Sequence, residues 1–176
     1  FRNLPRAAYE MKNIANFLFE VGMLKRTPRS GYQFLGTGRE SVAAHSFRTT
    51  IIGYGLSHAA READPNRTVL LCLVHDLHEA RTGDLNYVNK RYIDVDEDKA
   101  VHDLTADVPF GDTIVDLIQE FNDGDTLESR LARDADQLDL ILELKEQTDL
   151  GNKHALEWIH FALQRLQSEA AKDMAR

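Results

Sequence analysis

Apolar residues recur at helical spacing through most of this 176-residue chain. Such spacing places an apolar stripe along one side of a helix, whereas a half-buried strand alternates with period two. No segment alternates cleanly for more than a few residues, and no internal repeat interrupts the pattern. We therefore expect an all-α fold with one domain over 1–176, a helical bundle of six to seven helices at about 5–23, 41–61, 65–81, 96–105, 109–121, 126–149 and 153–171.

The segment 69–84 is the centre of this pattern. Six consecutive apolar residues at 69–74 lead directly into charged side chains, which indicates a buried element. Asp64 and Pro65 suit the cap and first turn of a helix, and Gly83 suits its end. The segment is therefore expected to be a buried helix rather than a strand.

Three polar side chains follow this apolar run: His75, Asp76 and Glu79. On a continuous helix Glu79 lies four residues from His75 and three from Asp76, so all three would share one face. Burying them is costly unless they are paired or bind a metal. We therefore regard this helix face as part of a candidate functional site.

Composition and charge narrow the classes of partner. The chain is 43% hydrophobic and 28% charged, which is enough for one ordinary core. A net charge of −8 argues against a general nucleic-acid or membrane-surface binder, although a metal and a few arginines can reverse the field locally for a small anion. No signal-peptide pattern and no apolar stretch long enough to span a membrane is present.

Cys72 is the single cysteine, and it lies inside the apolar run. A disulfide within the chain is therefore impossible, which favours a cytoplasmic location. A buried cysteine usually behaves as a small hydrophobe, so we expect Cys72 to fill the core rather than to act as a nucleophile.

A short basic segment at 25–31 ends the first predicted helix. It carries Lys25, Arg26 and Arg29 around Pro28. Two interpretations are open: a solvated basic turn, or a clamp that holds an anion over a site.

Residues on three predicted helices could together bind a metal: His45, the His75–Asp76 pair, and Asp134 or Asp136. Two imidazoles and two carboxylates form a mixed nitrogen and oxygen site suited to a divalent first-row metal. Such a metal lowers the pKa of bound water and stabilises charge on a phosphoryl oxygen. The alternative is a buried His–Asp pair that only ties helices together.

The order His45, His75–Asp76, Asp136 resembles the HD superfamily of metal-dependent phosphohydrolases. The likeness covers roughly residues 10–150 and extends to its 5′-deoxynucleotidase branch, in the motifs 21–32 (VGMLKRTPRSGY), 39–46 (RESVAAHS), 75–84 (HDLHEARTGD) and 135–138 (ADQL). The resemblance implies an all-helical HD-domain bundle, usually a homodimer, that hydrolyses nucleoside 5′-monophosphates to nucleoside and phosphate. The alternatives are other phosphorylated nucleotides, whether di- or triphosphate or cyclic, and a catalytically vestigial protein that senses nucleotides.

The resemblance also implies roles for individual residues. The metal ligands would be His45, His75, Asp76 and Asp136, with Asp136 favoured over Asp134 by register. The metal would be one divalent ion, with Mn, Co, Fe, Ni, Zn and Mg all left open.

The same resemblance implies catalytic and substrate-binding residues. Glu79 would act as general acid or base beside the attacking water. Arg26 would hold the substrate phosphate, with Arg29 a weaker candidate, because a guanidinium binds phosphate through two parallel hydrogen bonds. Asp84 would lie at the mouth of the site, where it could contact sugar hydroxyls or position the water.

Three departures from the branch affect the substrate pocket. Ala44 stands where the branch usually has an acidic residue before the histidine, which removes a partner for that histidine. Thr27 replaces an aromatic residue of some members, and the loop 85–91 lacks the usual proline. His78 is interpreted as a histidine beside the site or on the surface. Trp158 and Phe161 are interpreted as packing or dimer-interface residues rather than as a platform on which a base stacks.

Overall fold

The computed structural model describes residues 6–176, and this range contains helices, turns and one isolated bridge but no strand. The predicted all-α class is therefore confirmed, while the predicted start of the first helix at residue 5 lies outside the described residues. No helix within 6–176 has both the length and the apolar character needed to cross a bilayer. The longer helices are α1 (Arg6–Val21), α3 (Val42–Ala59), α4 (Pro65–Val74), α6 (Glu97–Thr105), α7 (Gly111–Asp123), α8 (Leu127–Asp149) and α9 (Ala155–Leu163).

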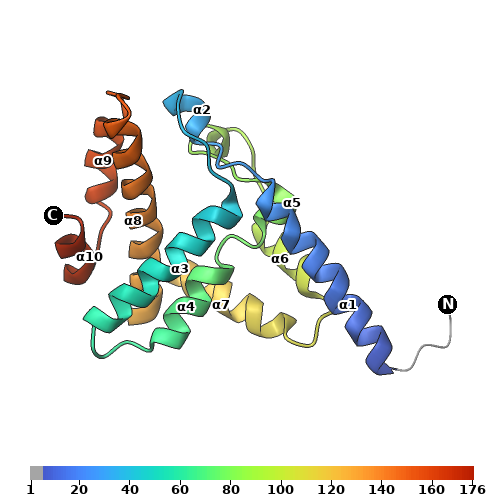
Figure 1. Ribbon diagram of the computed structural model, residues 1–176. Helices are drawn as coiled ribbons and strands as arrows, with labels where there is room; N and C mark the ends of the chain where they lie inside the picture. The colour runs from blue at the N-terminus through green and yellow to red at the C-terminus, as the bar shows by residue number, and fades with distance from the viewer. Residues whose placement is uncertain (1–5) are drawn as a thin grey trace.

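Short elements fill the connections between these helices: the 3₁₀ helices η1 (Gly22–Lys25) and η2 (Asn89–Arg91), and the α-helices α2 (Tyr32–Leu35), α5 (Glu79–Thr82) and α10 (Glu169–Met174). In Figure 1, α3, α4, α7 and α8 cross near the middle of the molecule, with α1 and α6 on one side and α9 and α10 on the other. The helix α4 packs against α3, α7 and α8, so the apolar run is central as expected.

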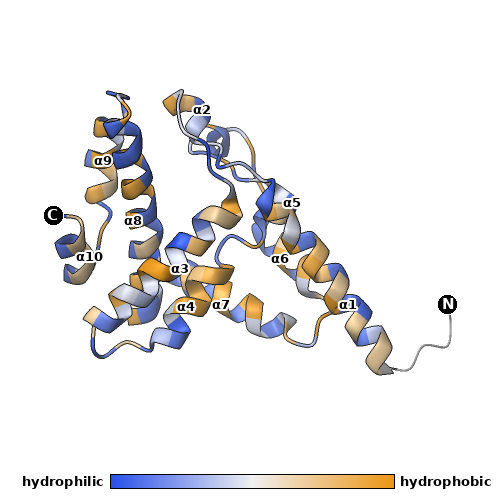
Figure 2. Cartoon of the chain, viewed as in Figure 1, coloured by the Kyte–Doolittle hydropathy of each residue, from blue (hydrophilic) through white to orange (hydrophobic). Residues whose placement is uncertain are grey.

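The core forms where these central helices meet. Its most buried side chains include Leu56 from α3, Leu71 and Cys72 from α4, and Leu131 and Ala135 from α8. Figure 2 shows hydrophobic colouring along much of α4 and hydrophilic colouring in the turn that precedes it. Cys72 is fully buried, in agreement with its expected place in the core.

Local sequence signals begin two of the central helices. The Ser41 hydroxyl accepts a hydrogen bond from the backbone N–H of Ala44 at the start of α3. The Asp64 carboxylate accepts two backbone N–H groups at the start of α4, where Pro65 occupies the first turn. Both caps match the sequence prediction, because they satisfy donors that the helix itself leaves unpaired.

The predicted continuous helix 65–81 is wrong at its end, because α4 stops at Val74. The ring Nδ1 of His75 bonds to the carbonyl oxygen of Cys72 at 2.8 Å, and that oxygen is the acceptor that the Asp76 N–H would use in a continuing helix. The next backbone bonds, Leu77 to Val74 and Glu79 to Asp76, reach back three residues. A tight turn therefore carries His75 and Asp76 out of α4.

The predicted helix 153–171 is also wrong, because α9 and α10 are separate. The Asp134 carboxylate of α8 accepts the backbone N–H groups of Gln167 at 2.7 Å and Ser168 at 2.8 Å. Ser168 then caps α10. The hydrogen bonds from Gln167 and Ser168 to Asp134 thus hold the chain between α9 and α10 outside a continuous helix.

Gly53 permits the close approach of α3 to α4. A Cβ at this position would lie 2.5 Å from Cys72 Sγ, which is too close for a real contact. It would lie 3.4 Å from Thr68 Cγ2, at the edge of ordinary van der Waals contact. Gly55, two residues along the same helix, has open space around the equivalent position. Since α3 and α4 carry the residues of the site described below, their spacing matters for its geometry.

We predict opposite effects for two alanine substitutions on α3. Gly53→Ala should destabilise the protein by about 1–3 kcal/mol, because the added methyl overpacks the α3–α4 contact. Gly55→Ala, the matched control, should stabilise it by about 0.5–1 kcal/mol, because alanine loses less conformational entropy in a helix. Urea unfolding of both variants measures the difference, and equal effects would contradict the close approach.

Candidate metal centre

Four predicted ligands meet where α3, α8 and the turn after α4 come together. His45 Nε2 lies 3.3 Å from His75 Nε2 and 3.2 Å from Asp136 Oδ1. Asp76 Oδ2 lies 3.5 Å from His45 Nε2 and 3.2 Å from His75 Nε2. His45 Nε2 therefore lies close to an atom of each of the other three, and the ligand atoms of His45, His75 and Asp76 are all mutually close, although the residues come from three distant segments.

The two histidines present the correct nitrogen for a metal. His75 Nδ1 bonds to the Cys72 carbonyl, and His45 Nδ1 bonds to Asp139 Oδ2 at 2.6 Å. An Nδ1–H that donates in this way leaves the lone pair on Nε2, which faces the carboxylates. Two neutral imidazole nitrogens and two carboxylates suit a divalent cation, so the residues present fit a metal.

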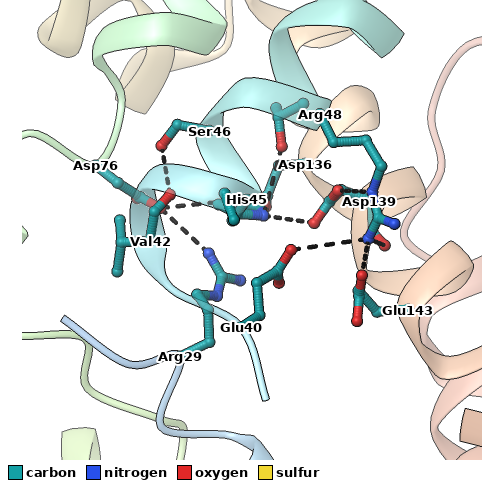
Figure 3. Close-up of polar contacts among 12 residues, drawn as sticks. Arg29, Glu40, Val42, His45, Ser46, Arg48, Asp76, Asp136, Asp139 and Glu143 are labelled. Carbon is teal, nitrogen blue, oxygen red and sulfur yellow. Dashed lines mark hydrogen bonds and ion pairs between the residues drawn. The ribbon is translucent and has the colours of Figure 1, made fainter. Parts of the chain in front are cut away.

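Asp139 is the residue that sequence reasoning missed. It is almost fully buried, and its second oxygen accepts from Arg48 Nε at 2.5 Å. Arg48 in turn pairs with Glu143, and Figure 3 shows this chain of contacts extending from His45 across α8. Asp139 lies three residues after Asp136, a spacing that places both on one helix face and could have identified it. Asp139 supplies the histidine partner that Ala44 does not.

The structure distinguishes the two candidate aspartates of α8. Asp136 approaches His45, whereas Asp134 accepts the backbone N–H groups of Gln167 and Ser168. The two are two residues apart and so point to different sides of the helix. Asp134 therefore fastens the chain before α10, and Asp136 is the one at the centre.

Electrostatics at the centre favour cation binding. Burial opposes ionisation of Asp136, but its hydrogen bond to His45 and the nearby positive charges lower its pKa to about 2. Burial and Arg29 depress the pKa of His45, yet its bonds to Asp136 and Asp139 outweigh them and raise it to about 9. A cation must then displace a proton from His45, so its affinity should increase with pH.

Arg29 lies against this centre. Its guanidinium is 3.2 Å from Asp76 Oδ2, and despite burial the surrounding carboxylates raise its pKa, so it remains charged. The bridge between Pro28 and Ser41 joins its loop to the start of α3, with Arg29 N–H bonded to the Glu40 carbonyl at 3.0 Å. The loop that carries Arg29 is thus fixed to the helix that carries His45.

Arg26, by contrast, is exposed at the C-terminal end of η1. None of the ion pairs of the described residues involves it, and it does not line the cavity beside the centre. The structure therefore brings Arg29, rather than Arg26, to the metal ligands.

Glu79 is buried at the start of α5, with 7% of its surface exposed. Burial, and then the negative charges of Asp76 and Asp84, raise its pKa to about 9. One of its carboxyl oxygens has no hydrogen-bond partner among the described residues. The group can therefore hold a proton at neutral pH next to the ligands. His78, also buried, lies 3.8 Å from Glu97.

A cavity of about 520 Å³ opens beside the centre, a size typical of small-molecule sites. Arg29, Glu40, Asp84 and Asp139 line it near the metal ligands. Asp84 accepts the backbone N–H of Ser30 at 2.5 Å, so it braces the loop of Arg29 as well as facing the cavity.

Comparison with known families identifies this arrangement. The model of the HD domain matches residues 21–176. The chain belongs to the HD-domain family. The predicted resemblance to the HD superfamily is therefore confirmed, while the individual ligands stay predictions. A divalent metal ion is the cofactor that HD-domain membership and the donor set support.

Individual relatives agree with this assignment. The chain is 30% identical over 148 residues to the 5′-deoxynucleotidase HDDC2 of Bos taurus, covering 81% of this chain and 71% of that protein. It is 30% identical over 163 residues to the protein of the same name from Dictyostelium discoideum, covering 84% and 86%. A conserved hypothetical protein from Pyrococcus furiosus superposes with a TM-score of 0.81 at 28% identity, covering 92% of this chain and 96% of that one. The HD-domain fold is thus shared over nearly the whole chain.

We predict that Asp139 controls metal affinity. Asp139→Asn removes the charge that orients His45, and loss of such an outer partner typically weakens metal binding by about 10- to 100-fold. Calorimetric titration of chelator-stripped protein with Mn²⁺ measures the effect. Asp149→Asn, an exposed position on the same helix, is the control and should bind like the wild type. Unchanged affinity in the Asp139 variant, with its fold intact by circular dichroism, would contradict the role.

Proposed function

We propose that this HD-domain chain is a metal-dependent phosphohydrolase that removes phosphate from nucleoside or deoxynucleoside 5′-monophosphates. One observation supports the proposal: the predicted metal ligands, the half-buried Arg29 and the buried, proton-holding Glu79 lie beside a cavity of ligand size that Arg29 lines. The resemblance of the chain to 5′-deoxynucleotidases supports the choice of substrate.

The chain's own residues supply binding and proton transfer. The guanidinium of Arg29 would hold the substrate phosphate through paired hydrogen bonds, which also fixes the phosphorus beside the ligands. A divalent metal held by His45, His75, Asp76 and Asp136 would activate water and stabilise negative charge on phosphoryl oxygen. Glu79, protonated at neutral pH, would deliver its proton to the departing sugar oxygen and so avoid a free alkoxide.

The charge of the cavity favours a monophosphate over a di- or triphosphate. Its lining sets two arginines, Arg29 and Arg165, against the carboxylates of Glu40, Asp84, Asp139 and Glu157. A di- or triphosphate would bring additional negative charge against these carboxylates, and a polyphosphate generally needs more cationic partners. The complete set of ligands argues against a vestigial sensor.

The remaining parts of the proposal concern the whole protein. We include a single domain over 1–176, a homodimer and a cytoplasmic location, which the resemblance and the lone cysteine support. Nucleic acid and membranes are not proposed as partners, because the net charge of −8 would repel both.

We predict metal-dependent phosphate release from nucleoside 5′-monophosphates and not from 3′-monophosphates. Chelator-stripped protein would be supplied with Mn²⁺, Co²⁺, Mg²⁺ or Zn²⁺ and assayed with ribo and deoxy substrates. Arg29→Ala should lower kcat/KM by about 10- to 100-fold, the value of a charged hydrogen-bonded contact. Arg26→Ala, the matched control three residues away, should have the smaller effect. If Arg26→Ala lowers kcat/KM more than Arg29→Ala does, the phosphate contact is assigned to the wrong arginine. If no monophosphate releases phosphate with any of the metals, the proposed function is refuted.

Replacing the proton donor should separate chemistry from metal binding. Glu79→Gln keeps the shape of the side chain but cannot release a proton to the leaving group, so kcat should fall by about 10²- to 10⁴-fold. Its Mn²⁺ content, measured by atomic absorption, should equal that of the wild type. A variant that loses both metal and activity would instead make Glu79 part of the metal site.

A further inference from the structure

The cavity beside the predicted metal centre is lined by two chemically different sets of residues. Arg29 and Asp139 contact the predicted metal ligands. Trp158 and Phe161 of α9, together with Tyr87 from the loop after α5, form an aromatic set. Figure 1 shows α9 beside α8 and facing the region of α2. A ligand held at Arg29 can therefore extend to an aromatic wall.

Trp158 and Phe161 form one surface. They lie three residues apart on α9, so their rings are on the same helix face. Trp158 packs partly against the buried cluster of Leu35, Leu144 and Ala155, which holds its ring in place. Phe161 keeps 58% of its surface exposed. Phe161 has an edge contact with His160, with 5.7 Å between the ring centroids. The supported indole and this largely exposed ring still leave aromatic area open to a ligand.

We propose that this aromatic wall, Trp158 and Phe161, binds the base of the substrate by stacking. The inference rests on the proposed function, because Arg29 and the metal ligands fix where the phosphate lies and hence which way the nucleoside extends. An aromatic ring stacks on any base, since every base has a π face, so the wall should accept many bases while rejecting a sugar phosphate that lacks one. This proposal departs from the interpretation of Trp158 and Phe161 from sequence as packing or dimer-interface residues rather than a platform on which a base stacks.

The nearest polar groups do not offer an equally specific alternative. Arg165 lines the same cavity but is directed to Gln137, 3.4 Å away, and Glu157 is exposed on α9. Tyr32 donates its hydroxyl to Glu143 at 2.8 Å, so that donor is already used. Recognition of the base should therefore depend on its face more than on its edge.

The chain offers a direct optical test, because Trp158 is its single tryptophan. Adding a nucleoside without phosphate should quench the intrinsic fluorescence in a saturable manner, since a stacked base contacts the emitting ring. Deoxyribose 5-phosphate should not quench it. Quenching no greater than that of a free tryptophan derivative under the same conditions would overturn the proposal, whether or not the protein proves to be a phosphatase.

Substrate comparison gives an independent test. For Trp158→Leu and Phe161→Ala, kcat/KM for nucleoside monophosphates should fall about tenfold more than for deoxyribose 5-phosphate, the loss expected for one stacked base. Trp158→Phe should restore most of the difference, because it keeps an aromatic face. Leu156→Ala, at an exposed position of α9 outside the cavity lining, is the matched control.

The outcomes separate the two proposals. Hydrolysis of nucleotides and deoxyribose 5-phosphate with equal efficiency by the wild type would overturn the base-binding wall and leave the phosphatase proposal standing. An equal fall for both substrates in the Trp158 variant would likewise overturn it, because the ring would then only support the fold. Absence of hydrolysis of any phosphate would refute the function, and the fluorescence titration would still decide whether a base binds.

Discussion

The hydrogen bond between His45 and Asp139 joins the two longest helices of the site at a point with almost no solvent. A buried carboxylate without a partner is costly, and so is a buried imidazole whose nitrogens are unsatisfied. The bond pairs the His45 Nδ1 with one carboxylate oxygen of Asp139, and Arg48 donates to the other oxygen. The same bond sets which nitrogen of His45 faces the ligands, so helix packing and metal chemistry share one contact.

The rest of the site compensates for an unfavourable field. A chain with a net charge of −8 repels phosphate, and the centre adds more carboxylates of its own. Those carboxylates favour a cation, and Arg29 gives the anionic substrate a fixed positive partner beside it. Arg29 thus supplies attraction beside the predicted ligands, while the aromatic residues of the cavity lining would contribute contacts that depend little on charge.

The sequence predicted what local chemistry decides. Caps at Ser41 and Asp64 and the apolar spacing of α3, α4 and α8 act within a few residues, so these helices were predicted from the pattern alone. The metal residues themselves needed the resemblance to choose Asp136 over its neighbour Asp134.

Contacts between distant segments explain what was missed. The break before α10 depends on a carboxylate 33 residues earlier in the chain, and the local cap at Ser168 did not by itself predict it. Asp139 was hidden because an acidic residue on a long helix usually faces water, and only the packing of α8 on α3 buries it. Whether Arg26 or Arg29 faces inward likewise depends on how their loop is attached, which spacing cannot reveal.

That attachment has a consequence for how such a site can diversify. The bridge between Pro28 and Ser41 holds the two ends of the loop 30–40 together. This loop can therefore change in length or sequence and reshape the cavity near Tyr32 and Leu35 without displacing Arg29 from His45. Selection can therefore alter which molecule is admitted while the machinery that would act on its phosphate stays constant.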